Sequence, residues 1–286
     1  MMRTRARLSR LIRPGLLYLL LGTGTIVLLT PLIWAVSTSL KTTDQLALWP
    51  PQLIPHPVAW DNYGQVFQLV PLAQYFVNTL IVVACVEVGA LLTCSFVAYG
   101  FARTTFPGRN ALFLLMLSTM MMPFVVRLIP LYVIYRQTHW LNTLLPLTVP
   151  PLLGVSAFNI FLLHQSFKGL PQELSDAARI DGCNDFGIYW RIVLPLSKPA
   201  LAAVAVFAFQ AAWDDFLAPL IFLNGSPNLY TLTVGLYSLR GMPHEGLPLT
   251  QELMAMAVMM TLPVLLIFAV GQRYFIQGVT LGGIKG

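Results

Sequence analysis

The composition of this 286-residue chain fits a protein that lives in lipid: 57% of its residues are apolar, only 10% are charged, and its mean hydropathy is +0.72. A soluble domain carries roughly 25% charged residues, so this chain has too few ionic groups to cover a water-facing surface. The net charge of +6 is spread in small groups between apolar blocks, which argues against a basic nucleic-acid-binding stripe. The cysteines and histidines show no metal-ligand spacing, and we expect neither a metal nor a cofactor.

Six apolar segments follow one another along the chain, and each is long enough to cross a membrane. A hydrocarbon core of ~30 Å needs about 20 helical residues, and inside lipid only helices and closed barrels satisfy every backbone polar group. The segments lack the alternation of barrel strands, so we predict an all-α integral membrane protein with six transmembrane helices. The expected spans cover residues 14–37, 76–101, 111–135, 144–163, 199–223 and 252–272.

The amino-terminal residues 1–13 form a basic segment, and the remaining residues 14–286 are expected to form a single transmembrane domain. Five arginines before the first apolar block also fit a cleaved secretory signal. The block is longer than the ~7–15 apolar residues of such signals, and a short loop follows it, so we favour a retained span.

Lysine and arginine in short loops indicate which side of the membrane each loop occupies. The basic residues of the amino terminus, of the connections after the second and fourth spans, and of the carboxyl terminus all fall on one side of a six-span topology. Both termini are therefore expected to be cytoplasmic, in a multi-pass protein of the cell (inner) membrane.

Two oppositely charged residues, Glu87 and Arg127, lie within the second and third predicted spans. An ionisable group inside a membrane costs at least ~2.5–3.5 kcal/mol on insertion scales, so each needs a partner or a water-filled cavity. We favour an ion pair between the two spans, with contact to a substrate as the alternative.

The polar connection over residues 165–198, between the fourth and fifth spans, is expected to form two short helices on the cytoplasmic side. Pro171 suits the first turn of a helix, and Gly182 suits the left-handed position that ends one, which predicts a helix over residues 171–181. Asn184 is a good N-cap for the second helix. The chain would then make a helix-turn-helix elbow, although periodicity alone also allows a solvated loop ordered by its own helix.

The same connection contains a spaced motif that resembles a known family. Asp176-Ala177-Ala178 is followed after three residues by Gly182 and after nine more by Ile192-Val193-Leu194-Pro195. This pattern resembles the EAA loop, E-A-A-x3-G-x9-I-x-L-P, of the permease subunits of ATP-binding-cassette (ABC) importers, with Asp176 in place of the usual Glu. The resemblance extends over nearly the whole chain and is closest to the maltose-type carbohydrate permeases.

The resemblance implies a role as one of two membrane subunits in a binding-protein-dependent importer. The chain would form half of the translocation pathway for a sugar or related polyol, paired with a second homologous permease. Two cytoplasmic ATPase subunits and an extracytoplasmic sugar-binding protein would complete the machine. The residues that would couple to the ATPases are Asp176, Ala177, Ala178, Asp181, Gly182, Ile192, Leu194 and Pro195. No G-x-x-x-x-G-K-[ST] phosphate loop occurs, so we expect this chain itself to be no enzyme.

Further polar and aromatic residues in or near the spans are candidates for lining the sugar pathway. The fifth span carries Trp213-Asp214-Asp215-Phe216, a combination that suits hydrogen bonding and stacking with a polyol, although contact with the partner subunit fits equally well. The full set of pathway candidates is Asn78, Asn159, Gln210, Trp213, Asp214 and Asp215.

Two other classes of membrane protein remain as alternatives. An ion-coupled secondary carrier would use Glu87, Arg127 and Asp214 as its relay. An intramembrane protease is disfavoured because the sequence lacks H-E-x-x-H and G-x-S-x-G motifs.

Overall fold

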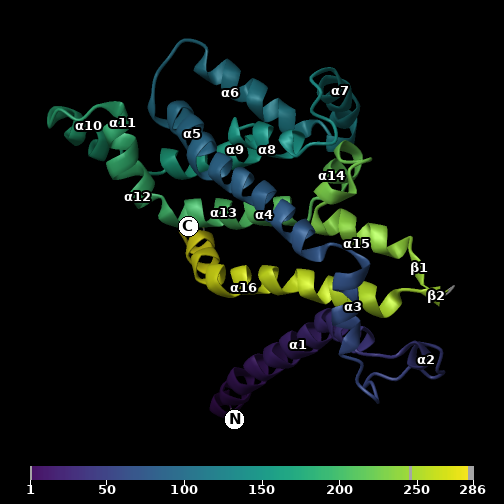
Figure 1. Ribbon diagram of the computed structural model, residues 1–286. Helices are drawn as coiled ribbons and strands as arrows, with labels where there is room; N and C mark the ends of the chain where they lie inside the picture. The colour runs from purple at the N-terminus through teal and green to yellow at the C-terminus, as the bar shows by residue number, and fades with distance from the viewer. Residues whose placement is uncertain (1, 245–246, 283–286) are drawn as a thin grey trace. The chain divides into compact units, whose positions relative to one another are not determined.

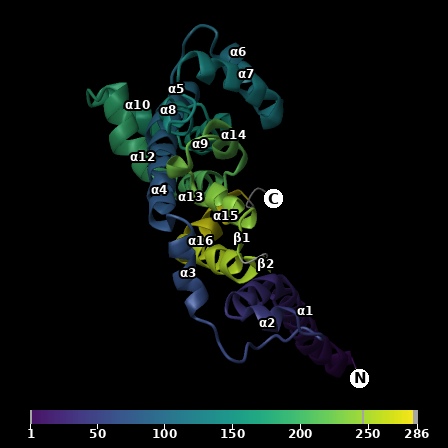
Figure 2. The same cartoon turned by 45° about the vertical axis from the view of Figure 1, so that its right-hand side comes forward.

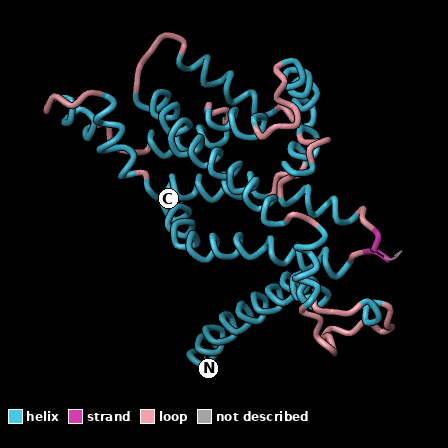
Figure 3. Tube along the Cα trace, viewed as in Figure 1, coloured by secondary structure: helices cyan, strands magenta, loops and turns pink. Residues whose placement is uncertain are grey.

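A computed structural model describes residues 2–244 and 247–282 of the chain. The described part is helical apart from one short antiparallel hairpin, in which β1 (Pro243–His244) pairs with β2 (Leu247–Pro248) (Figure 3). The chain divides into two compact units: unit 1 comprises Met1–Val70 with Leu239–Thr261, and unit 2 comprises Pro71–Ser238 with Leu262–Gly286. The prediction of a single transmembrane domain over residues 14–286 stays a prediction.

Unit 1 is built on the long first helix α1 (Met2–Ser39), the single turn α2 (Thr43–Leu46), α3 (Asp61–Leu69), the hairpin and the beginning of α16 (Thr250–Gly282). Asn62 of α3 donates from its side-chain amide to the carbonyls of Ser39 and Lys41, each at 2.9 Å. These bonds satisfy carbonyl groups that the end of a helix leaves without partners. The most apolar stretch of α1 has no buried residue, as a lipid-facing helix would.

Unit 2 is built around one long helix with a π-helical turn in its middle. α4 (Leu72–Val88), the turn η1 (Gly89–Thr93) and α5 (Cys94–Arg103) are continuous (Figure 1). This rod packs against α8 (Leu145–Leu152), α9 (Ala157–Lys168) and α13 (Lys198–Trp213). Ala98, Leu163, Phe167 and Val204 are completely buried where these helices meet.

The remaining helices of unit 2 are short. α6 (Arg109–Ser118), η2 (Thr119–Met121) and α7 (Phe124–Gln137) lie between α5 and α8 in the chain. α10 (Glu173–Ile180), α11 (Asp185–Ile188), the π-helical turn η3 (Tyr189–Val193) and α12 (Leu194–Leu196) connect α9 to α13. α14 (Leu217–Phe222), η4 (Pro227–Leu229) and α15 (Leu232–Arg240) follow α13.

The prediction of a helical membrane protein is confirmed, because four helices in the described part are long and apolar enough to cross a membrane. These are Leu17–Ser39, Leu72–Arg103, Leu145–Lys168 and Thr250–Gly271. Two bent helix pairs raise the number to six if each pair counts as one span. The predicted total of six spans therefore corresponds to the upper end of this range.

Two predicted spans are wrong as single straight helices. The third, over residues 111–135, bends by 100° between α6 and α7, where Pro123 follows Met122. Proline disfavours helical backbone at the residue before it, and Met122 is accordingly extended. The fifth, over residues 199–223, ends at Trp213, because Asp215 turns its carboxylate to the backbone N–H of Ala218 and starts a new helix, α14.

The π-helical turn η1 fits against the junction of α8 and α9. Gly89 lies so close to the Pro151 carbonyl that a Cβ there would overlap with it. Thr93 donates from its hydroxyl to the Leu152 carbonyl at 2.7 Å. A π-turn leaves a helix locally irregular, and here the irregular parts of two neighbouring helices satisfy each other.

We expect Gly89→Ala to destabilise the protein by about 1–3 kcal/mol, since the added methyl group forces two backbones apart. The measurement is the midpoint of thermal unfolding of the purified protein in detergent. Gly100→Ala is the matched control, because a Cβ at Gly100 meets nothing within 4 Å and alanine favours the helix. Equal midpoints for the two variants would show that the close approach at Gly89 has no energetic weight.

Candidate functional site

The segment α10–α12 holds the spaced motif found in the sequence, and it lies at one edge of unit 2 (Figure 1, Figure 2). Gly182, between α10 and α11, has a φ of 81°, the left-handed conformation that the sequence predicts for it. Asn184 caps α11, as predicted, because its side chain accepts from the backbone N–H of Gly187 at 2.8 Å. The first helix is shorter than the predicted 171–181 and begins at Glu173.

Arg179 joins the two short helices through charge. Its guanidinium lies 3.2 Å from Asp176 and 3.0 Å from Asp185. The hydrogen bond and the charge of Asp185 raise the pKa of Arg179, which therefore stays charged. Because all three side chains are well exposed, such pairs contribute only about 0–1 kcal/mol, and they orient α11 on α10 more than they stabilise it. Asp176, the acid of the motif, is thus engaged within its own segment.

The two faces of α10 differ in their surroundings. Ser175 is buried, and Ala178 packs against the hydrophobic core of unit 2. Ala177 and Asp181 face outward. The segment also exposes large apolar side chains, of which Phe186 and Trp190 stack on each other with ring centroids 6.4 Å apart. An exposed apolar surface of this kind marks an interaction site in many proteins.

Arg103, at the end of α5, fixes the start of this segment. The residue is buried, and its guanidinium donates to three oxygens: the carbonyls of Phe167 and Leu170, at 2.9 and 2.6 Å, and the side chain of Gln172 at 2.7 Å. In the sequence, Arg103 is one of the basic residues after the second predicted span, which indicate membrane topology. Its position directly after an apolar span was the available signal, but the carbonyls that it binds lie more than 60 residues away.

Tyr189, the first residue of η3, ties the other end of the segment to α5. Its hydroxyl lies 2.7 Å from Ser95 Oγ, and both residues are buried. Ser95 in turn donates to the carbonyls of Leu91 and Leu92 in the turn η1, so Tyr189 is the donor to Ser95. Phe96 also packs edge-on against the Tyr189 ring.

The last three motif residues lie where the segment turns into the next long helix. Ile192 belongs to η3, whereas Leu194 and Pro195 belong to α12. Leu194 packs against the core of unit 2, and Pro195 is exposed. The helices Asp185–Leu196 and Lys198–Trp213 meet at an angle of 80°, so the segment is joined to α13 by a sharp corner.

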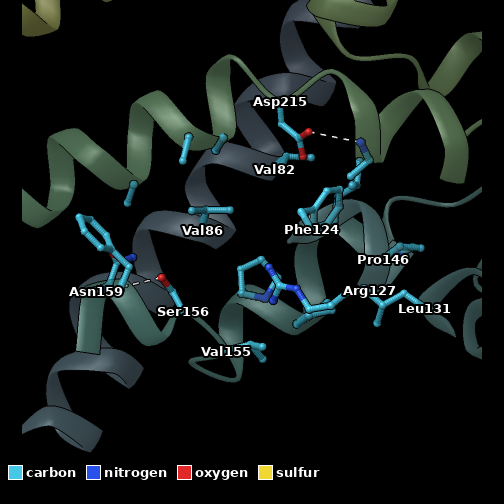
Figure 4. A pocket seen from close by; sticks show the side chains of 18 of the residues that line it. Val82, Val86, Phe124, Arg127, Leu131, Pro146, Val155, Ser156, Asn159 and Asp215 are labelled. Atoms are coloured by element: carbon cyan, nitrogen blue, oxygen red, sulfur yellow. Dashed lines mark hydrogen bonds between the residues drawn. The ribbon is translucent and has the colours of Figure 1, made fainter. Parts of the chain in front are cut away.

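A cavity of about 690 Å³ opens among α4, α7, α8, α9, α13 and α14 (Figure 4). Its walls are mostly apolar, and its polar lining includes Arg127, Ser156, Asn159, Gln210 and Asp215. Ser156 caps α9 by accepting from the backbone N–H of Asn159 at 3.4 Å. Three of the six predicted pathway residues, Asn159, Gln210 and Asp215, therefore share one cavity.

The other three predicted pathway residues lie elsewhere. Asn78 donates to the carbonyls of Asn228 and Tyr230, at 2.9 and 3.1 Å, and so holds the connection before α15. Trp213 is buried beside Phe209, with ring centroids 5.3 Å apart. Asp214 is exposed at the end of α13.

The predicted ion pair between Glu87 and Arg127 is wrong. Within the part of the chain that the structure describes, no carboxylate lies within 4.0 Å of Arg127, and the buried atoms Glu87 Oε1 and Arg127 Nε have no hydrogen-bond partner. The bend at Pro123 is the reason, because it turns α7 by 100° away from α6. Arg127 lines the cavity instead, and Glu87 does not. Substrate contact, the alternative for Arg127, is compatible with this position.

Comparison with known proteins decides the family. Residues 90–281 match the family described as the binding-protein-dependent transport system inner membrane component. The chain belongs to this family. The matched range contains the whole segment α10–α12 and most of the walls of the cavity. The assignment also confirms a multi-pass protein of the inner membrane type.

Several relatives in this family are permeases of sugar transport systems. The chain is 36% identical to the arabinooligosaccharides transport system permease protein AraQ of Halalkalibacterium halodurans, over 90% of this chain and 91% of that protein. It is 32% identical to the galactooligosaccharides transport system permease protein GanQ of Bacillus subtilis, over 98% of each chain. A crystal structure of a bacterial ABC transporter involved in the import of the acidic polysaccharide alginate contains a chain with the same fold. That chain is 24% identical, with a TM-score of 0.82 over 93% of this chain and 98% of that one.

We expect Arg103→Met to loosen the start of α10, since three oxygens lose a charged donor, at a cost of at least about 2 kcal/mol. The measurement is the rate of proteolytic cleavage within residues 169–184 in membrane vesicles, which should rise severalfold. Arg191→Met is the matched control, because Arg191 is exposed and the change removes the same charge. Unchanged protection in Arg103→Met would show that the guanidinium does not hold this connection.

Proposed function

We propose that this chain is a permease subunit of an ABC importer and forms half of the translocation pathway for an oligosaccharide or a related polyol. A second homologous permease, two cytoplasmic ATPase subunits and an extracytoplasmic sugar-binding protein would complete the complex. Both termini and the segment α10–α12 would face the cytoplasm. The observation that carries the proposal is the motif Asp176 to Pro195, which keeps the EAA spacing and forms two short helices at an edge of unit 2.

The exposed face of this segment suits a protein partner. Ala177 offers a small side chain that lets another surface approach closely, while the stacked rings of Phe186 and Trp190 offer apolar area. Aromatic residues of this kind dominate the energetics of many interfaces. We propose that the ATPase binds here, through Asp176, Ala177 and Ala178 in α10, Asp181 and Gly182 in the turn after it, and Ile192, Leu194 and Pro195 in η3 and α12.

The attachments of the segment would let it act as a lever. Arg103 holds its start, and Tyr189 bonds through Ser95 to the turn η1. η1 contacts the junction of α8 and α9 through Thr93, and Cys94 lies within 3.9 Å of the Ser156 carbonyl. Ser156 lines the cavity. Closure of the ATPases would thus move a chain of packed elements that ends at the cavity wall, as in a rigid-body transition.

Two observations support a sugar as the transported substrate: the names of the relatives and the lining of the cavity. Relatives named for arabinooligosaccharide and galactooligosaccharide transport match nearly the whole chain. Asn159 and Gln210 supply amides of the kind that hydrogen-bond hydroxyl groups, and Phe158 and Phe207 form an edge-to-face pair that sugar rings could stack against. An ion-coupled carrier has no comparable support, because its relay residues Glu87 and Asp214 do not line the cavity that contains Arg127.

We expect Gly182→Val to abolish ATP-dependent sugar uptake while leaving the chain in the membrane. Valine at a φ of 81° is strained, which deforms the turn between α10 and α11, yet a Cβ there meets nothing within 4 Å. The measurements are uptake of a labelled oligosaccharide and the amount of ATPase subunit that copurifies with the tagged chain.

The matched control is Gly100→Val, which adds the same side chain inside α5 in open space. It should keep at least half of the uptake. If Gly182→Val took up sugar at the wild-type rate, the proposal that the segment α10–α12 acts as a lever would be wrong. A complex without any nucleotide-hydrolysing subunit would refute the importer itself.

We expect Tyr189→Phe to lower the amount of sugar carried per ATP hydrolysed, since it removes the hydrogen bond between the segment and η1. The bond is worth about 0.5–1.5 kcal/mol, so the protein should still fold. Ser95→Ala and the double variant complete a cycle, and the double variant should lose little more than either single one. Fully additive losses would mean that the two residues act independently. Tyr18→Phe, on the exposed surface of α1, controls for loss of a hydroxyl.

A further inference from the structure

Among the described residues that line the cavity, Arg127 is the one with a positive charge. It lies in the first turn of α7, and its side chain reaches into the cavity, as Figure 4 shows. The Nε atom is buried without a hydrogen-bond partner. The described contact of its guanidinium is with the Phe124 ring, whose centroid lies 5.8 Å from Cζ.

A guanidinium in an apolar cavity is unusual because it keeps its positive charge there. Arginine stays protonated in proteins, and a charged group at membrane depth is costly unless it meets a partner or water. Arg127 lies at a cavity, and no described carboxylate lies within 4.0 Å of its guanidinium. Arg127 therefore brings a positive charge and at least one unpaired donor, Nε, to the cavity.

The carboxylate that shares the cavity does not neutralise Arg127. Asp215 lies at the junction of α13 and α14, and its Oδ1 accepts from the backbone N–H of Ala218 at 3.3 Å (Figure 4). The hydroxyl of Thr233 donates to the backbone carbonyl of Asp215 at 2.6 Å. This second bond holds Asp215 at the start of α14. Glu87 and Asp214 do not line the cavity. Among the residues that the structure describes, no carboxylate forms an ion pair with the guanidinium.

We propose that the cavity admits a sugar bearing an anionic group, a carboxylate or a phosphate, and that Arg127 binds this group. The proposal rests on the proposed function and adds a substrate class to it. Arginine is suited to the task because its planar donors match both carboxylate and phosphate oxygens in a two-point contact. Asn159 and Gln210, on the α9 and α13 walls, would bind the hydroxyl groups of the same sugar.

The test measures binding to the complex that the tagged chain forms in its native membrane, purified in lipid nanodiscs and titrated by calorimetry. One pair of probes is trigalacturonate and its methyl ester, which share a skeleton and differ in charge. The other pair is glucose 6-phosphate and glucose. We expect at least one anionic probe to bind about tenfold or more tightly than its neutral counterpart, and the pair that shows the preference distinguishes carboxylate from phosphate.

Variants assign the preference to Arg127. Arg127→Gln should abolish it while leaving the affinity for the neutral probe within about twofold, and Arg127→Lys should keep part of it, because lysine retains the charge without the fork. Arg136→Gln removes an exposed charge from the far end of the same helix and should behave as the wild type.

The proposal is wrong if the wild-type complex shows no preference for either anion, whether both members of a pair bind equally or neither binds. It is also wrong if the preference survives in Arg127→Gln. ATP-dependent uptake of a neutral oligosaccharide by the wild-type complex would then leave the importer function standing. Failure of that function would appear instead as uptake that needs no ATPase.

Discussion

The structure depends on one constraint: within lipid, each backbone polar group must find its partner inside the protein. Helices meet this need along their length, but a transporter also needs breaks that can move and line a cavity. In unit 2 the breaks occur where neighbouring groups satisfy them. Thr93 bonds to Leu152 at the end of α8, Thr79 accepts from the backbone N–H of Leu232 at the start of α15, and Asp215 starts α14.

The same breaks place the functional groups. The bend at Pro123 brings Arg127 to the cavity, and the break after Trp213 brings Asp215 to it. The junction of α8 and α9 contributes Ser156 and Asn159. A bundle of uninterrupted helices would have left these side chains at other heights and on other faces. Irregular backbone at membrane depth is tolerated where it is buried in protein or lines a cavity, and these breaks meet that condition.

The segment α10–α12 and the cavity are connected because both contact the same long helix. The rod α4–η1–α5 contacts the segment α10–α12 through Ser95 and Arg103, and contributes Val82 and Val86 to the cavity. The buried hydrogen bond between Ser95 and Tyr189 and the close backbone approach at Gly89 hold this rod against its neighbours. Packed interfaces of this kind switch between arrangements rather than deform continuously, as the lever in the proposed function requires.

The sequence by itself determined the helical membrane class, because each apolar segment is long enough to cross lipid. It also determined the left-handed turn at Gly182 and the cap at Asn184, because the conformational preferences of glycine and of capping residues act over a few residues. The spaced motif from Asp176 to Pro195 pointed to the family. The sequence also named Asn159, Gln210 and Asp215, since polar groups in apolar spans are rare. Only the tertiary structure decided that Arg127 stands apart from Glu87 and that Arg103 and Tyr189 fix the segment α10–α12. Those outcomes depend on how far helices bend and on carbonyls distant in the chain, which no local pattern of residues encodes.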